Sequence, residues 1–521
     1  MDSITSTTPG SWDAIPNELR LMILGYLVKW KEPGAPLASV SKDWQALVER
    51  HTFSRLKLTA SRLTEFDKIV THERQTYVRY LWFSLELEEY SCHDCDDESG
   101  DESGDESGYE TDELLEDDDS DVVDPFVTRK RECAFIGKTF FELFKVLNSW
   151  PSKDELVLDI SAHSPSDNKH GFKYLTFEPD WQHDDLAQRC LQERLMRYDS
   201  QNIEETGCET RIPGHHALHK LFSDIHERDP SPANLGRKWW CRLPKVPAIT
   251  SIMLRQQNHR RWNPEILEHL ASLCPSLTDF NYEPWREWEN DVQVAQTDPA
   301  YIKLFSSLPT VRNLVLFENF SENYARTDDA DRERSRCVAV SQVIAAKSRE
   351  LEKLSASFLA DAQYFFESTS RQWRWLNLTS FAMTSTLLNA NGIDDRIQKM
   401  LADAASVAKQ MPKLRVMELW NGRESEAMVF RYESPRNGGI ATVMCRGSWP
   451  LLLSDEVKEL WADVAGLQRC HIHFLDWQSV PAESISSHAA AIDALRLVNQ
   501  VIRPISQQQI FWETLQRNEI K

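Results

Sequence analysis

The sequence lacks the motifs by which most enzymes bind nucleotides, metals or acyl groups. Only 17 of its 521 residues are glycine, and neither a Gly-x-Gly-x-x-Gly string nor a Walker phosphate loop occurs. The strings His-Glu-x-x-His and Gly-x-Ser-x-Gly are absent as well. We therefore expect a protein with no catalytic residues, no cofactor and no metal ion.

Long apolar runs and an export signal are also missing. Residues 1–12, expected to be a flexible N-terminus, show no basic stretch followed by an apolar core, and no segment approaches the roughly 20 apolar residues that span a bilayer. The 10 cysteines are scattered without regular spacing, as is typical of free thiols in a reducing compartment. We expect a cytoplasmic or nuclear location and no membrane contact.

The net charge of −22 comes mostly from one segment. Asp and Glu supply 17 negative charges between Asp94 and Asp124, where no Lys or Arg occurs, so about −5 remains for the rest of the chain. This near-neutral remainder gives no reason to expect nucleic-acid binding, which requires a basic surface.

Residues 94–128 are predicted to be a disordered acidic segment, because like charges repel each other and few apolar side chains are available for a core. Ser99, Ser103 and Ser107 each precede a Glu by three positions. This spacing resembles the sites of acidophilic kinases, so these serines are candidate phosphorylation sites. The alternative is a solvated loop without a function.

Residues 13–60 are predicted to form a small helical unit. Pro16 suits the first turn of a helix, where a missing N–H group costs nothing. The helix that follows carries two apolar stripes on nearly opposite sides, one made by Leu19, Met22, Ile23, Tyr26 and Leu27 and the other by Leu21, Leu24 and Val28. A second helical pattern after the break at residues 31–36 can cover one stripe, so the other stripe needs a further partner.

The same residues resemble the F-box. The string Ile15-Pro-Asn-Glu-Leu is followed by Ile23-Leu24, by Leu27, and then by Leu37-Ala-Ser-Val-Ser-Lys-Asp-Trp44. Ile15 replaces a usual Leu, and Ser41 replaces a usual Cys. The resemblance implies that this unit binds the Skp adaptor and, through it, a cullin. The adaptor-binding residues that it implies are Ile15, Pro16, Leu19, Ile23, Leu24, Leu27, Val40 and Trp44. The alternative is that the two helices pack only on the rest of this chain.

Residues 129–425 repeat a Leu-x-x-Leu-x-Leu pattern, mostly preceded by a helical segment. Six copies begin at residues 249, 277, 311, 351, 378 and 414, and more diverged copies begin near residues 78 and 156. The diverged copy near residue 78 lies in residues 61–93, which link the F-box to the acidic segment. The pattern predicts an α/β fold: an irregular solenoid resembling leucine-rich repeats, with parallel strands and helices. The alternative is an ordinary α/β domain whose strands are parallel.

In such a repeat the positions i, i+3 and i+5 face the core, and the positions between them face the concave side of the solenoid. This predicts a target-binding surface that includes Arg255, Asn281, Phe317, Lys353 and Trp420. Phe317 and Trp420 are large enough to be core residues instead. A compact basic cluster at residues 255–261 is expected to be a solvated rim. The alternative is a site for phosphate or for an acidic degron.

Strings between residues 240 and 320, such as Tyr282-Glu-Pro-Trp-Arg-Glu-Trp288, also resemble fungal F-box proteins of unassigned target. Residues 426–521 are predicted to be an α/β cap, with a hairpin around Pro435-Arg-Asn-Gly-Gly followed by helices near residues 455–465 and 484–502. These features together indicate a substrate-receptor subunit of an SCF-type cullin-RING ubiquitin ligase, with a protein target that the sequence does not identify. The alternative is an F-box scaffold that acts without a cullin.

Overall fold

The computed structural model describes residues 15–30, 38–90, 125–169, 175, 177–180, 218, 220–222, 224–225, 237–287, 292–320, 337–436 and 438–520. The candidate phosphorylation sites Ser99, Ser103 and Ser107 lie outside these residues, as does the flexible N-terminus expected at residues 1–12. Within the described residues, no helix is long and apolar enough to span a membrane.

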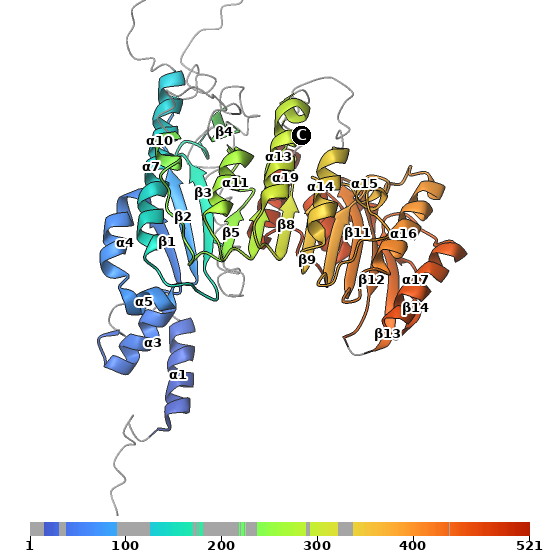
Figure 1. Ribbon diagram of the computed structural model, residues 1–521, viewed down its shortest axis with the longest axis horizontal. Coiled ribbons are helices and arrows are strands. Elements are labelled where there is room, and N and C mark those ends of the chain that lie inside the picture. The colour runs from blue at the N-terminus through green and yellow to red at the C-terminus, as the bar shows by residue number, and fades with distance from the viewer. Residues whose placement is uncertain are drawn as a thin grey trace, which may run out of the picture.

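One mixed sheet of 13 strands, mostly parallel, runs through the described residues (Figure 1). From β1 to β11 each strand of this sheet pairs in parallel with the strand of the same sheet that follows it in the chain. Its strands are β1 (Arg55–Thr59), β2 (Tyr80–Glu86), β3 (Val157–His163), β5 (Ser251–Leu254), β7 (Asp279–Tyr282), β8 (Asn313–Phe317), β9 (Lys353–Ser357), β10 (Ser380–Thr384), β11 (Val416–Arg423), β12 (Glu426–Glu433), β13 (Gly439–Gly447), β14 (Cys470–Phe474) and β15 (Gln478–Ser479). Two short strands, β4 (Asp224–Ile225) and β6 (Arg261–Trp262), pair separately.

The strands that the repeat pattern predicts are confirmed. Each of the six copies coincides with a parallel strand from β5 to β11, and the diverged copies near residues 78 and 156 coincide with β2 and β3. The predicted hairpin is also present, because β12 pairs with β11 and β13 in antiparallel fashion. The proposed boundary at residue 425 falls between β11 and β12, which are neighbours in the same sheet.

Helices cover one face of the sheet in a row, which is called here the helix face (Figure 1). Alternation along each strand explains the packing: Phe280 and Tyr282 of β7 are buried in the main apolar core, whereas Asp279 and Asn281 between them are only half-buried. The helices of this row are α4 (Leu63–Ile69), α7 (Pro125–Asn148), α10 (Arg237–Trp240), α11 (Pro264–Ser272), α13 (Asp298–Ser307), α14 (Val338–Ser348), α15 (Ala362–Glu367), α16 (Asp394–Ala408) and α17 (Asp455–Leu467).

Local signals set the helix ends. Asn263 caps α11, because its side-chain oxygen accepts a hydrogen bond from the Glu265 N–H at 2.9 Å, and Pro264 occupies the first turn. Ser454 caps α17 through the Val457 N–H. Short single turns occur as η2 (Ala60–Arg62), η3 (Gln293–Thr297) and η4 (Ala482–Ser484).

The opposite face of the sheet, called here the inner face, is covered by the C-terminal helices α18 (His488–Leu495) and α19 (Pro504–Ile520). Ala489, Ile492 and Leu495 of α18 share a second apolar core with Phe317 and Trp420. The helix predicted over residues 484–502 is therefore shorter than expected. It ends where Arg496 takes a left-handed conformation with a φ of 51°.

Candidate functional site

An apolar surface on the N-terminal helix is the first candidate site. Helix α1 (Asn17–Trp30) packs on α3 (Lys42–Thr52) and projects from the end of the sheet (Figure 1). Five apolar side chains around it are exposed to solvent: Leu19 by 49%, Met22 by 57%, Ile23 by 40%, Tyr26 by 72% and Val40 by 61%. We call these five residues the α1 surface. Four of them lie on α1 and Val40 lies just before α3, and such a group of exposed apolar residues is typical of an interaction site.

Helix α3 anchors this surface to the body of the protein. Ser41 caps α3 by accepting a hydrogen bond from the Trp44 N–H, and Val48 on the same helix is buried. Glu49 forms an ion pair of 2.7 Å with Arg74 of α5 (His72–Tyr77), and the hydrogen bond from Arg74 lowers the pKa of Glu49. The α1 surface is therefore attached to the sheet through α3 and α5.

The structure describes most of the residues that the F-box resemblance implies. Ile15 and Trp44 are half-buried, and Pro16 is exposed. Leu19, Ile23 and Val40 belong to the α1 surface. The side chains of Leu24 and Leu27 lie outside the described part of the molecule, although both residues are within helix α1.

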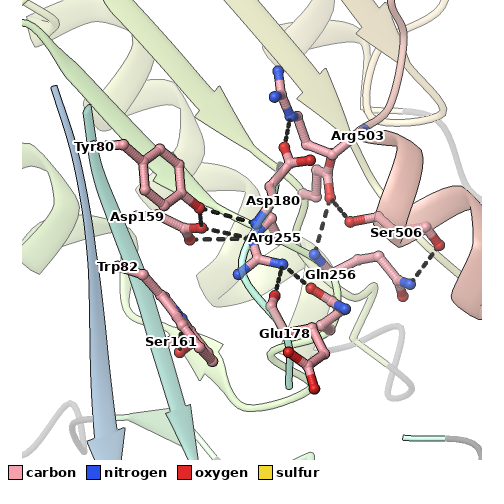
Figure 2. A network of polar contacts seen from close by, with 12 residues as sticks. Tyr80, Trp82, Asp159, Ser161, Glu178, Asp180, Arg255, Gln256, Arg503 and Ser506 are labelled. Carbon is pink, nitrogen blue, oxygen red and sulfur yellow. Dashed lines mark hydrogen bonds and ion pairs between the residues drawn. The ribbon is translucent and has the colours of Figure 1, made fainter. Parts of the chain in front are cut away.

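A buried polar network on the inner face is the second candidate site (Figure 2). Arg255 forms an ion pair of 2.9 Å with Asp159 of β3, and its guanidinium also donates to the Glu178 carbonyl at 2.7 Å. Tyr80 of β2 donates a hydrogen bond to Asp159. Burial lowers the pKa of Arg255, but its interactions with Asp159, Tyr80 and Asp180 together outweigh this effect, so the pKa is raised and the guanidinium stays charged.

Burial on the inner face corrects the prediction for three of the five target-binding residues. Arg255, Phe317 and Trp420 are at most 3% exposed. Arg255 is paired within the protein, and the other two lie in the core beneath α18. The prediction of an open surface is wrong for them because other parts of the chain cover these side chains. Helix α18 covers Phe317 and Trp420, and Arg255 is held by Asp159 and the Glu178 carbonyl. Asn281 within β7 is half-buried and Lys353 at the start of β9 is exposed, so both remain partly accessible.

The basic cluster is likewise not a solvated rim. Arg260 is buried and makes a two-pronged ion pair with Asp167, and its Nη2 donates at 2.9 Å. His259 is buried beside Trp285, and burial lowers the pKa of its imidazole to about 3. These side chains therefore hold loops on the sheet and do not form an open anion-binding site.

Glu283 and Gln256 form the centre of the inner-face network. The Glu283 carboxylate accepts hydrogen bonds from the Gln256 N–H at 3.0 Å, the Arg503 N–H at 2.6 Å and the Ser506 hydroxyl at 2.6 Å. The Gln256 side chain donates to the Ser506 carbonyl at 2.9 Å and accepts from Asn319 at 2.6 Å. Two strand ends are thus tied directly to the start of α19.

A second buried carboxylate holds the loop between α18 and α19. Glu418 of β11 accepts hydrogen bonds from the backbone N–H groups of Val498 and Asn499 at 2.9 and 2.8 Å. The Asn499 side chain and the Arg431 guanidinium each donate to the same carboxylate at 2.7 Å. Glu418 therefore fixes this loop over the sheet.

The C-terminal partners of these carboxylates, such as Asn499, Arg503 and Ser506, were not found from the sequence. The apolar composition of α18 could have indicated that this helix is buried, because it contains more apolar residues than a helix on the surface needs. Nothing local marks Arg503 or Ser506, since their partners lie more than 200 positions earlier.

The described residues contain no group of three or more His, Cys, Asp or Glu residues that could hold a metal ion. His471 and His473 on the edge strand β14 are both exposed. These two histidines therefore do not belong to such a group among the described residues.

Comparison with known proteins adds one match. Residues 307–503 match the model of a family of unknown function (DUF6546). The matched segment begins at the end of α13 and ends at Arg503, so it includes Trp420, Glu418 and α18. It covers less than half of the chain and does not reach α1 or α3. No curated protein matches the sequence.

Proposed function

We propose that this protein is the substrate-receptor subunit of an SCF-type cullin-RING ubiquitin ligase. In this proposal residues 15–52 bind the Skp adaptor, which connects the chain to a cullin, and the large sheet and its helices present a target protein. The chain itself carries no catalytic residues, no cofactor and no metal. It acts in the cytoplasm or the nucleus, with no nucleic acid or membrane as partner.

The α1 surface is the observation that carries this proposal. Its five apolar side chains are exposed, and three of them, Leu19, Ile23 and Val40, occupy positions that the F-box resemblance assigns to the adaptor contact. Burying one large apolar side chain contributes about 1.5 to 3 kcal/mol, so several of them supply enough free energy for a specific complex. Helix α3 is already packed on the body, which leaves α1 oriented for a partner.

The order of the strands supports the repeat part of the proposal. Parallel strands follow one another along the chain from β1 to β11, and most connections between them contain a helix of the same face. This arrangement favours an irregular solenoid related to leucine-rich repeats, in which the α1 surface lies at the β1 end. The target would then bind along the sheet and away from the adaptor, and the accessible candidates for this contact are Asn281 and Lys353.

An F-box scaffold that binds the adaptor without a cullin is the second candidate. Both functions require the α1 surface, so its geometry does not distinguish them. They differ in whether a cullin is recovered with the adaptor and whether a bound protein is ubiquitylated.

The test is affinity purification of the full chain from cells that contain the adaptor and cullin. We compare wild type with the double variant Leu19→Asp and Ile23→Asp, whose side chains are exposed, so that the fold should survive. The matched control is Leu452→Asp, which is 77% exposed on the connection before α17.

We expect the double variant to lose the adaptor and cullin while the control retains both. Equal recovery of the adaptor with all three proteins would refute the F-box proposal. Recovery of the adaptor without a cullin, and without ubiquitylated proteins, would favour the scaffold.

A further inference from the structure

Three neighbouring loops bring basic side chains together where the central strands of the sheet begin. Strands β9, β10 and β11 pair in parallel and in register. The loops that lead into them from α14, α15 and α16 occupy residues 349–352, 368–379 and 409–415. Because parallel strands begin at the same edge of a sheet, these loops lie side by side. We call the three loops the basic edge.

Hydrogen bonds fix the middle loop between its two neighbours. The Trp375 indole N–H donates to the Ser348 hydroxyl at 2.7 Å, and the Trp375 backbone N–H donates to the Gln410 carbonyl at 3.1 Å. The Thr379 N–H donates to the Glu352 carbonyl at 2.8 Å. Trp375 is fully buried, so it anchors the loop in the main core. The side chains of the basic edge are therefore carried on an ordered backbone.

The basic edge has a local excess of positive charge. The loops at residues 368–379 and 409–415 contain five Lys or Arg residues and no Asp or Glu. The loop at residues 349–352 adds Arg349. The chain outside the acidic segment carries a net charge of about −5, so this accumulation of cations is a property of the edge and not of the whole protein.

The carboxylates beside the basic edge do not neutralise most of these cations. They have other partners: Glu350 pairs with Lys347 at 2.7 Å, Glu352 pairs with Arg312 at 3.3 Å, Asp463 pairs with Lys409 at 2.9 Å, and Glu367 accepts a hydrogen bond from Gln363 at 2.9 Å. Five cations of the basic edge form no ion pair within the described part of the chain: Arg349, Arg371, Arg374, Lys413 and Arg415. Five positive charges are thus left for a partner.

Neutral contacts orient these cations. The Arg349 guanidinium lies over the Trp373 ring, 5.1 Å from its centroid. Arg374 Nη1 donates to the Trp373 carbonyl at 2.9 Å, and Lys413 Nζ donates to Asn377 Oδ1 at 2.9 Å. An aromatic ring, a carbonyl and an amide leave the full positive charge in place. The basic edge is therefore a preorganised set of charges, which lowers the cost of binding an anionic partner.

An acidic peptide fits this surface better than a nucleic acid does. Leu376 in the middle loop is 62% exposed, and Trp373 beside it is half-buried, so the cations flank apolar surface. A peptide can cover this surface with an apolar side chain while its carboxylates meet the cations. A nucleic acid needs phosphate contacts along an extended basic surface, whereas the rest of this chain has a negative net charge.

We propose that the basic edge binds a linear protein segment in which Asp or Glu residues alternate with apolar ones. The carboxylates of this segment pair with Arg371, Arg374 and Lys413, and an apolar side chain covers Leu376. Lys353, which is accessible for target contact, begins β9 directly after the first loop, so the basic edge continues that surface. As a site for the target, the basic edge rests on the proposed function; as a peptide-binding surface it does not.

The test is fluorescence anisotropy of a labelled peptide of alternating aspartate and leucine, titrated with the purified full chain at low salt. The matched control peptide has asparagine in place of aspartate. We expect the aspartate peptide to bind and the asparagine peptide to bind much more weakly. Binding should weaken as sodium chloride is added, because salt screens exposed charges. Equal binding of the two peptides would overturn the proposal.

A pair of double variants locates the binding on the chain. Arg371→Ala with Arg374→Ala removes two exposed cations of the basic edge, so the affinity should fall by about fivefold or more. The control is Arg396→Ala with Lys399→Ala, which removes two exposed cations from α16 and should leave the affinity unchanged. The same affinity for both double variants would place the peptide elsewhere and refute the basic edge.

Two further measurements keep the result decisive. If circular dichroism shows that the first double variant is poorly folded, Lys413→Ala replaces it, because this exposed side chain contacts only Asn377 in the described structure, and the affinity should fall about twofold. An unchanged affinity of Lys413→Ala would then count against the proposal. A single-stranded oligonucleotide that binds the basic edge more tightly than the aspartate peptide would overturn the choice of a protein segment.

The 17 negative charges of residues 94–124 are an internal competitor, so the titration is repeated with a chain that lacks them. Binding that appears only after this deletion, and that is lost with Arg371→Ala and Arg374→Ala, would support the basic edge and identify the acidic segment as its competitor. Absence of binding to both proteins would refute the proposal. None of these measurements involves the adaptor, so their failure is distinct from failure of the F-box proposal.

Discussion

The guanidinium of Arg503 forms a buried ion pair with Asp180, which lies 323 positions earlier in the chain. The pair joins the start of α19 to the loop at residues 177–180, whose Asp180 N–H in turn donates to the Tyr80 hydroxyl. The start of α19 is thus connected through a few side chains to β2, near the opposite end of the sheet from β14.

Loss of this ion pair should be strongly destabilising. Arg503→Met leaves Asp180 as a buried charge without its partner, so we expect the free energy of unfolding to fall by about 3 to 5 kcal/mol. Denaturant unfolding measures this change. The double variant with Asp180→Asn should recover a part of the loss, because it removes the uncompensated charge. Equal stabilities of the wild type and Arg503→Met would contradict the pairing.

Trp420 should act as a core residue and not as a target contact. It is fully buried among Phe358 and the side chains of α18, so Trp420→Ala should lower the free energy of unfolding by about 3 to 5 kcal/mol. Lys353→Ala is the control, because this exposed residue should change stability by less than about 0.5 kcal/mol. Thermal or denaturant unfolding checks both. A Trp420 variant as stable as the control would contradict the core role of Trp420 and would support its role as a target contact.

Glu418 should control the order of the loop before α19. Glu418→Ala removes the acceptor for the Val498 and Asn499 N–H groups and leaves Arg431 without its carboxylate. We expect a loss of about 1 to 3 kcal/mol in the free energy of unfolding. Faster hydrogen exchange at residues 498 and 499 than in α18 would accompany it. Unchanged exchange at these two residues would show that the loop is held by other contacts.

Removal of the acidic segment should leave the fold intact. Deletion of residues 94–124 takes away 17 negative charges and few apolar side chains, so the melting temperature should stay within about 2 °C of the wild-type value. Differential scanning calorimetry of the two proteins checks this. A decrease of about ten degrees would mean that the deletion removes part of the core.

The sequence by itself determined the local elements. The apolar pattern i, i+3 and i+5 predicted the strands from β2 to β11, because side chains on a strand alternate between two faces and the apolar set must be buried. The two stripes of residues 19–28 predicted a helix with more apolar surface than its neighbour covers, and Leu19, Met22, Ile23 and Tyr26 are indeed exposed. These properties depend on residues only a few positions apart.

Only the tertiary structure decided which side of the sheet faces solvent. The polar positions between the apolar ones suggested an open inner face, but Glu283 and Gln256 bind groups that lie 220 and 250 positions further along the chain. A local sequence pattern does not distinguish a buried polar side chain from a solvated one, because the two differ only in whether their hydrogen-bond partner is another part of the protein or water. Phe317 and Trp420 are therefore buried for a reason that no local spacing contains, because the C-terminal helices fold back over them. Arg255 is buried for a similar reason, because its partners Asp159 and Glu178 lie 96 and 77 positions earlier in the chain.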